Sequence, residues 1–231
     1  MTQTQRPELI LVGCGAVFET LKHSWAEQRS LRVYALASTD GAADAAALLL
    51  SDVDVGGAKV FVAVDGNALN YARLEVYGRL RLLGFKCDTL IHSSAIVDRS
   101  ARIGENCWIG AGAIIGPGVR VGHNTFIGAA TRVEFGATIG SNTWLGAGAA
   151  IGRAASVGTH TVIGDSVHIG GLVSVGRHCV VDVPGHYAAS LVDGTFIDAL
   201  FPVAARIYAP GRPAPKSATA ISGNLPKGRA A

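Results

Sequence analysis

The chain has 231 residues, of which 49% are hydrophobic, and a formal charge of +3. This composition supplies a core for one or two domains and speaks against a disordered chain. No stretch reaches the roughly eighteen consecutive apolar residues of a membrane span, and no basic patch with interleaved aromatic residues suggests nucleic acid. The N-terminus lacks a charged-then-apolar signal pattern, so we expect a cytoplasmic protein.

Four cysteines, Cys14, Cys87, Cys107 and Cys179, lie far apart in the chain and lack the spacing of metal ligands. We therefore expect reduced, buried thiols and no metal site.

Residues 1–90 have the pattern of a small α/β domain. Apolar strands are expected at residues 8–12, 31–37 and 60–64, and helices at residues 16–28, 40–50 and 68–83. Strands that alternate with helices indicate a parallel sheet, which here amounts to a Rossmann-like half.

Two turns follow strands of this expected sheet at the edge where parallel sheets bind ligands. Gly13-Cys14-Gly15 follows the first strand, and Asp65-Gly66-Asn67 follows the strand at 60–64. Phe18 stands where a third glycine of a dinucleotide-binding motif would be. The first turn therefore has three possible roles: strand–helix packing alone, binding of a phosphate or nucleotide sugar, or binding of NAD. Asn67 either caps the next helix or contacts a ligand.

The stretch from Val97 to Val181 repeats every six residues without a break. The repeated positions hold fifteen aliphatic residues: Val97, Ile103, Ile109, Ile115, Val121, Ile127, Val133, Ile139, Leu145, Ile151, Val157, Ile163, Ile169, Val175 and Val181. Hexapeptide repeats of this kind build parallel β-helices. We predict a triangular prism with one hexapeptide per face, wound as a left-handed parallel β-helix over residues 91–185.

Residues eighteen apart should then stack in columns from coil to coil. Cys107, Thr125, Thr143, Thr161 and Cys179 form an expected inward column, and Trp108, Phe126 and Trp144 an outward one. Asn106, Asn124 and Asn142 fall at one corner, where asparagine tolerates a left-handed backbone, and His160 and His178 continue that column. The outward aromatic column is too apolar to remain exposed to solvent in a monomer, so we expect a homotrimer to cover it.

Val183-Pro184-Gly185 is expected to end the prism. Residues 186–209 form a C-terminal extension, in which Asp193-Gly194 suggests either a hairpin turn or a strand–helix connection. Residues 210–231 are rich in Pro, Gly, Ala, Ser and Lys and are expected to be a disordered tail.

Several stretches together resemble a known family: Val12-Gly13-Cys14-Gly15, Phe61-Val62-Ala63-Val64-Asp65-Gly66-Asn67, Gly84-Phe85 and Leu90-Ile91-His92-Ser93-Ser94-Ala95-Ile96-Val97. They resemble the hexapeptide-repeat sugar acyltransferases that acetylate sialic acid or UDP-amino-sugars. The resemblance implies acetyl-CoA as co-substrate, a nucleotide-sugar or glycan acceptor, and a homotrimer with active sites between neighbouring prisms. It makes Gly13, Cys14, Gly15, Asp65, Gly66 and Asn67 candidate substrate-binding residues, and Trp144, Gly146, Ile151 and Gly152 candidate cofactor-binding residues.

The resemblance does not extend to the family's catalytic histidine. Phe135 stands at the position of that general base, Gly136 at its acidic partner, and Trp144 at a second family histidine. His123, twelve residues earlier on a different corner, and Glu134, beside Phe135, are the candidate catalytic residues that remain. The structural alternatives are a surface turn residue for His123 and a solvated corner carboxylate for Glu134.

Two functions stay open from the sequence. One is an acyl-CoA-dependent acyltransferase that acts on a nucleotide-linked or polysaccharide sugar. The other is a non-catalytic, sugar-nucleotide-binding or scaffolding trimer whose former active cleft is filled by Phe135 and Trp144.

Overall fold

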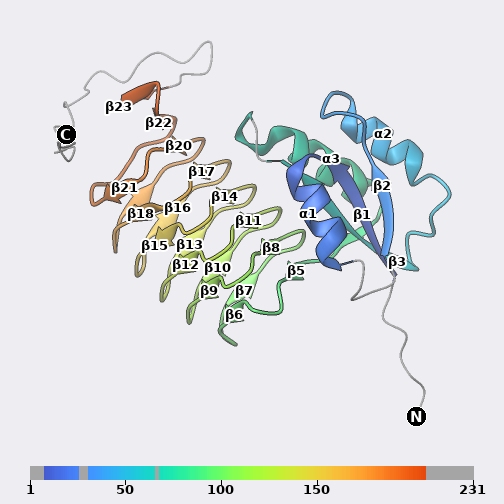
Figure 1. Ribbon diagram of the computed structural model, residues 1–231, viewed down its shortest axis with the longest axis horizontal. Coiled ribbons are helices and arrows are strands. Elements are labelled where there is room, and N and C mark those ends of the chain that lie inside the picture. The colour runs from blue at the N-terminus through green and yellow to red at the C-terminus, as the bar shows by residue number, and fades with distance from the viewer. Residues whose placement is uncertain (1–7, 26–30, 66–67, 207–231) are drawn as a thin grey trace.

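The computed structural model describes residues 8–25, 31–65 and 68–206, which form an α/β domain beside a long prism (Figure 1). The two parts are joined where the last strand of the α/β sheet leads into the first coil of the prism. Within the described residues, no helix has the length and apolar character needed to cross a membrane.

The α/β domain has a four-stranded parallel sheet in the order β2-β1-β3-β4. Its elements are β1 (Glu8–Cys14), α1 (Ala16–Trp25), β2 (Leu31–Ala35), α2 (Ala42–Leu49), β3 (Ala58–Val64), η1 (Ala68–Asn70), α3 (Tyr71–Leu82) and β4 (Lys86–Cys87). The predicted parallel sheet is confirmed, and β4 was missed because it is only two residues long.

The two faces of this sheet follow from alternation along β1. Ile10 and Val12 pack under α2 and α3, while Leu9 and Leu11 pack on the α1 side. A strand that buries both faces reads as a continuous apolar run, as parallel sheets require.

The prism has three parallel sheets, and we name two of its faces. The aromatic face contains β5 (Leu90–Ile91), β8 (Trp108–Ile109), β11 (Phe126–Ile127), β14 (Trp144–Leu145), β17 (Val162–Ile163), β20 (Val180–Val181), β22 (Thr195–Asp198) and the antiparallel β23 (Phe201–Arg206). The arginine face contains β7 (Arg102–Ile103), β10 (Arg120–Val121), β13 (Thr138–Ile139), β16 (Ser156–Val157) and β19 (Ser174–Val175). The third face contains β6 (Ile96–Val97), β9 (Ile114–Ile115), β12 (Arg132–Val133), β15 (Ala150–Ile151), β18 (Val167–Ile169) and β21 (Gly185–Tyr187).

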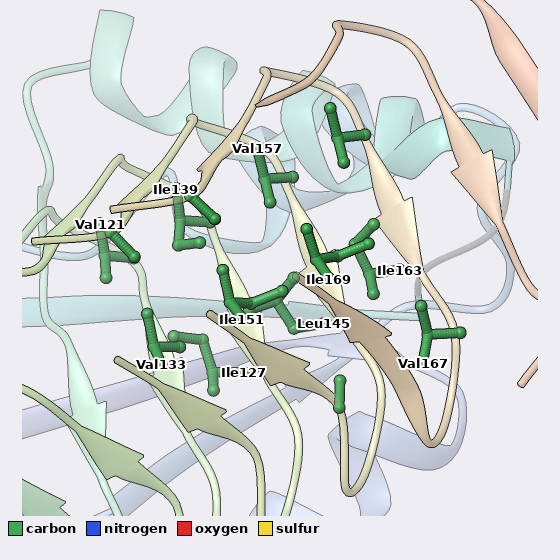
Figure 2. Close-up of a cluster of buried hydrophobic side chains, with 14 of the residues drawn as sticks. Val121, Ile127, Val133, Ile139, Leu145, Ile151, Val157, Ile163, Val167 and Ile169 are labelled. Atoms are coloured by element: carbon green, nitrogen blue, oxygen red, sulfur yellow. The ribbon is translucent and has the colours of Figure 1, made fainter. Parts of the chain in front are cut away.

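The interior of the prism is the predicted aliphatic core. Figure 2 shows Ile127, Leu145 and Ile163 among the side chains that meet inside it, and each has 0% exposure. The buried threonine column is satisfied from within, since the hydroxyls of Thr125 and Thr143 donate to the carbonyls of Gly140 and Gly158 at 3.0 and 3.1 Å. A period of six persists because each inward residue meets its equivalents one coil above and below.

The predicted asparagine corner is also confirmed. Asn106, Asn124 and Asn142 have left-handed φ angles of 53°, 55° and 56°, and His160 and His178 continue with 55° and 54°. Each asparagine amide donates to the side-chain oxygen of the next, at 2.7 Å in both steps. The column is therefore a directed hydrogen-bond ladder along one edge of the prism.

The prediction that the prism ends at Gly185 is wrong. β21 pairs with β18, Leu191 bridges to Val175, and β22 pairs with β20, so the chain winds one further coil. This coil is shorter because Leu191 lies sixteen residues after Val175 instead of eighteen, which hides it from a strict repeat.

The hairpin of the C-terminal extension lies at a different turn from the one suggested. It joins β22 to β23 around Asp198–Phe201, whereas Gly194, with φ 72°, forms a corner of the last coil. The predicted tail at 210–231 lies outside the described residues.

The start of the aromatic column is covered by the same chain, whereas the sequence suggested a homotrimer as its cover. Trp108, at 7% exposure, shares a buried cluster with Phe18 and Leu21 of α1 and with Leu90, and Phe126 packs against it. The α/β domain thus covers the start of the aromatic face. An uncovered strip therefore gives no argument for a trimer.

Candidate functional site

The carboxyl edge of the α/β sheet is organised around Asp65. Its two carboxylate oxygens each accept one hydrogen bond, from the backbone N–H groups of Ala16 and Val17, both at 2.8 Å. These are orphan donors of the first turn of α1, and a negative charge there is stabilised by the helix dipole. Asp65 is therefore the cap of α1, although it lies in the turn after β3.

The glycines of the first turn make this arrangement possible. A Cβ at Gly13 would collide with the carbonyl oxygen of Ala63, and a Cβ at Gly15, where φ is 91°, would collide with the Asp65 carboxylate. Strand–helix packing thus accounts for both glycines. A phosphate at the same helix end would have to displace a carboxylate that already holds two donors.

The other substrate-binding candidates lie close to this cap. Cys14 is half-buried, and the pKa of its thiol is raised by burial and, to a smaller degree, by the nearby Asp65 charge. Gly66 and Asn67 lie outside the described residues. Binding of a sugar nucleotide at this edge stays a prediction.

A cavity of about 370 Å³ lies between α1 and the aromatic face, and we call it the α1 cavity. Its aromatic wall is Trp108, Phe126 and Trp144. Its polar and small lining residues are Thr20, Ser24, His92, Asp165, Gly110, Ala111, Gly128, Ala129, Gly146 and Ala147. The cavity combines an apolar wall with a few convergent polar groups, as small-molecule sites generally do.

His92 enters the α1 cavity with one ring nitrogen already engaged. Its Nδ1 accepts a hydrogen bond from the backbone N–H of Ser94 at 3.2 Å and lies 2.8 Å from the Ser94 hydroxyl. That hydroxyl accepts from the backbone N–H of Gly112, so its own proton is directed toward Nδ1. We assign the neutral ring proton to Nε2, which makes His92 a hydrogen-bond donor toward a ligand.

Asp165 is the carboxylate of the α1 cavity. One oxygen accepts a hydrogen bond from the backbone N–H of Ala147 at 2.7 Å, which fixes the group on its corner. The cavity therefore offers one imidazole donor and one carboxylate to a polar ligand. Neither residue was singled out strongly from the sequence, because each lies at an ordinary corner position of the repeat.

Trp144 is held between neighbours on the cavity wall. Its ring stacks on Phe126 with centroids 3.9 Å apart and an interplanar angle of 11°. The guanidinium of Arg73, from α3, lies 5.4 Å from its centroid and donates to the carbonyl of Asn124 at 2.8 Å. Trp144 is thus held in place as part of the cavity wall, because a cation over an indole ring is a favourable contact.

Arg73 itself is an unusual buried charge that sequence reasoning missed. It is 3% exposed, and burial lowers its pKa to about 10. Within the described residues, its Nε has no hydrogen-bond partner and its guanidinium forms no ion pair. In the sequence it looks like one more arginine on a helix, since only the docking of α3 on the prism buries it.

The candidate catalytic residues lie outside the α1 cavity and on two different corners. His123 accepts a hydrogen bond at Nδ1 from the backbone N–H of Glu105 at 3.0 Å, which secures the corner below it. Glu134 forms an ion pair with Arg132 at 3.2 Å, and both side chains are more than one-third exposed. Phe135, beside Glu134, is 60% exposed.

The candidate cofactor residues divide between these two places. Trp144 and Gly146 line the α1 cavity. Ile151 and Gly152 lie directly above Glu134, whose N–H donates to the carbonyl of Ile151 at 2.9 Å. The Ile151 side chain points into the prism core at 0% exposure, so only its backbone is available to a ligand.

Comparison with known proteins agrees with this architecture. The GMPPB C-terminal domain family matches residues 85–188. None of the curated proteins gives a significant match to the sequence. The acetyltransferase domain of PglB from Neisseria gonorrhoeae FA1090 superimposes with a TM-score of 0.58 at 20% identity, over 87% of this chain and 100% of that domain. The chain therefore shares the fold of that acetyltransferase domain, an α/β domain followed by a parallel β-helix.

Two further solved structures of this kind contain ligands. PerB from Caulobacter crescentus, in complex with CoA and GDP-perosamine, matches at 23% identity over 82% of this chain and 92% of that one, with a TM-score of 0.49. The PglB acetyltransferase domain in complex with acetyl coenzyme A matches at 19% identity over 87% of this chain and 99% of that one, with a TM-score of 0.47.

Proposed function

We propose that this chain is an acyl-CoA-dependent acyltransferase, with acetyl-CoA as the expected donor and a nucleotide-linked or polysaccharide sugar as acceptor. The observation that carries the proposal is the α1 cavity, which lies in a fold shared with the acetyltransferase domain of PglB. In the reaction, the acceptor nitrogen or oxygen attacks the thioester carbonyl carbon, the CoA thiolate leaves, and the acceptor proton passes to a base.

The α1 cavity supports the binding of a polar, ring-shaped acceptor. Trp108 and Phe126 supply apolar contact, while the Nε2 of His92 and the carboxylate of Asp165 supply one donor and one acceptor. We assign Asp165 to the acceptor's ammonium or hydroxyl group. Holding both reactants in line supplies a large part of the barrier reduction, which favours an amine acceptor when no strong base is present.

The proposal includes the replacement of the family's general base by Phe135. A phenyl ring takes up no proton, so transfer to a hydroxyl acceptor is expected to be slow. Phe135 and Glu134 lie on a corner away from the α1 cavity of the same chain, so a site that uses both requires a second copy. We therefore propose a homotrimer in which this corner faces the neighbouring prism, in the cytoplasm, where its four free cysteines stay reduced.

The proposed loss of the general base is tested by restoring a histidine at position 135. Phe135→His with Gly136→Asp and Trp144→His should raise transfer to a hydroxyl acceptor by about a hundred- to ten-thousand-fold, the usual value of general-base catalysis. Gly136 has φ 69° and open space around it, and aspartate tolerates this conformation better than most residues. His123→Ala and Glu134→Gln in the parent chain are the companion variants. Brisk parental turnover that is lost in either of them would assign the base to that residue.

The alternative is a non-catalytic trimer that binds a sugar nucleotide or serves as a scaffold. The observation that favours it is the fixed Trp144 ring, which Phe126 and Arg73 hold in the space of the cavity wall. Titration with acetyl-CoA, followed by thiol release in the presence of amino and hydroxyl nucleotide sugars, separates the two functions. Binding without any thiol release, in the parent and in the triple variant, would support the scaffold.

A further inference from the structure

The arginine face carries a second depression, which shares no lining residue with the α1 cavity. It has a volume of about 560 Å³ and runs across β7, β10 and β13. We call it the arginine groove. Its polar lining consists of Arg102, Arg120, Thr138, Ser141 and Thr159. No carboxylate lines it among the described residues, so all its charged groups are positive.

The two arginines are direct neighbours in the ladder. Arg102 pairs with Arg120 in register, and Thr138 follows Arg120 in the same column. Neighbouring strands are roughly 4.8 Å apart, and like charges directly opposite each other destabilise a sheet. The isolated chain therefore carries an unfavourable interaction on this face that a bound anion would relieve.

The nearest acidic side chains in sequence are engaged elsewhere. Asp98 accepts hydrogen bonds from the N–H and hydroxyl of Ser100 at 2.8 and 2.6 Å. Glu105 forms an ion pair with Arg81 of α3 at 3.3 Å. Within the described part of the chain, neither Arg102 nor Arg120 forms an ion pair.

The hydroxyls of the arginine groove add donors of the same kind. The Ser141 oxygen accepts a hydrogen bond from the backbone N–H of His123 at 3.1 Å, so its proton is available to a ligand. Thr138 and Thr159 supply two further hydroxyls to the lining of the groove. Two planar guanidinium forks and three hydroxyls form a donor-rich surface suited to the oxygens of phosphate groups.

We propose that the arginine groove binds a diphosphate group. Two adjacent forks can hold the oxygens of two linked phosphates, and the volume exceeds what one phosphate fills. Under the proposed function, two substrates carry a diphosphate, namely the acyl-CoA donor and a nucleotide-sugar acceptor. Which of the two occupies the groove rests on the proposed function, whereas the diphosphate site itself does not.

The first experiment titrates the full-length protein with inorganic pyrophosphate by calorimetry at low salt. The expected result is binding that the double variant Arg102→Gln/Arg120→Gln weakens by about tenfold or more, as the loss of charge-assisted hydrogen bonds predicts. Arg99→Gln is the matched control, because this exposed arginine is in the same coil and outside the groove. The double variant should fold at least as stably as the parent, since it removes a like-charge contact.

Two results would overturn the site: pyrophosphate affinity that the double variant leaves unchanged, or an equal loss in Arg99→Gln. Titrations with acetyl-CoA and with a nucleotide sugar then identify the source as the ligand whose affinity falls with both arginines. A protein that binds pyrophosphate through these arginines and transfers no acyl group would retain the site and lose the proposed function. Acyl transfer with KM values that do not depend on either arginine would support the proposed function and show that neither substrate uses the arginine groove.

Discussion

Single side chains that secure the corners of the prism explain why candidate catalytic residues are hard to recognise in this sequence. His123, Ser141 and Asp165 each accept a hydrogen bond from a backbone N–H one coil earlier, at 3.0, 3.1 and 2.7 Å. Histidine, serine and aspartate at this position of the hexapeptide are therefore equivalent acceptors, whichever corner they occupy. A histidine here has a structural role before any chemistry is assigned to it.

Asp65 gives a prediction at the residue scale. Replacing it with asparagine leaves one oxygen for two helix donors and removes a charge from the N-terminus of α1. We expect the free energy of unfolding to fall by about 1 kcal/mol, within the usual range for helix caps and dipole interactions. Urea denaturation measures this, with the exposed Asp52→Asn as control. Equal stability of the two variants would show that Asp65 does not stabilise α1 as a cap.

At the scale of elements, the start of α3 is docked on the histidine end of the corner ladder. Tyr71 stacks on His160 with centroids 5.4 Å apart, and His160 stacks on His178 at 4.8 Å. Asn70 donates to the carbonyl of Asn142 at 3.0 Å, and the Asn142 amide lies 3.0 Å from the Nδ1 of His160. Because that amide is a donor, the docked arrangement requires a neutral His160 with an unprotonated Nδ1.

This docking predicts a loss of stability in mild acid. Burial, and then the neighbouring His178, lower the pKa of His160 below its ordinary value of 6.5. The unfolded chain takes up this proton near pH 6.5, while the folded chain takes it up only at lower pH. The contribution is therefore complete above pH 6.5 and is lost as the pH falls from there through the lowered folded pKa.

His160→Asn tests this, because asparagine extends the ladder of Asn106, Asn124 and Asn142 without a titrating ring. Urea denaturation between about pH 7 and pH 5 should show a smaller loss of stability in His160→Asn than in the parent. The exposed His23→Asn should behave like the parent. A parental pH dependence that survives in His160→Asn would contradict the prediction.

At the scale of the whole molecule, a shared core joins the α/β domain to the prism. Phe18 and Leu21 of α1, Leu9 and Leu11 of β1, and Trp108 of the aromatic face belong to one buried cluster. The two parts therefore depend on each other for burial. Calorimetry of the parent chain should show one cooperative unfolding transition.

Trp108→Ala should separate the two parts. Removing this ring costs about 3–5 kcal/mol in a typical core and opens the boundary between α1 and the prism, so two transitions are expected. Leu145→Ala is the control, since this residue lies in the prism core alone and should lower the stability while one transition remains. A single transition in both variants would show that the shared cluster does not couple the parts.

The assembly is also tested at this scale. Light scattering at micromolar concentration should give three times the chain mass if the proposed homotrimer forms. The aromatic face gives little support for a trimer, because α1 already covers the start of this face. A monomer would leave the corner of Phe135 without a facing α1 cavity, and the proposed intersubunit site would be excluded.

The sequence by itself determined the prism, its three faces, its inward threonine column and its asparagine corner. Each of these depends on contacts between residues eighteen apart, so one repeated choice of residue type specifies them all. The parallel α/β sheet was predictable for a similar reason, because apolar runs and helical segments alternate locally.

The tertiary structure alone decided the features that lack a period. Asp65 caps a helix that begins 49 residues earlier, and Arg73 is buried against the carbonyl of Asn124, 51 residues away. The coil after Gly185 and the α1 cavity depend equally on which surfaces meet. No local pattern encodes such pairs, since each residue acquires its role only when a distant element supplies the partner.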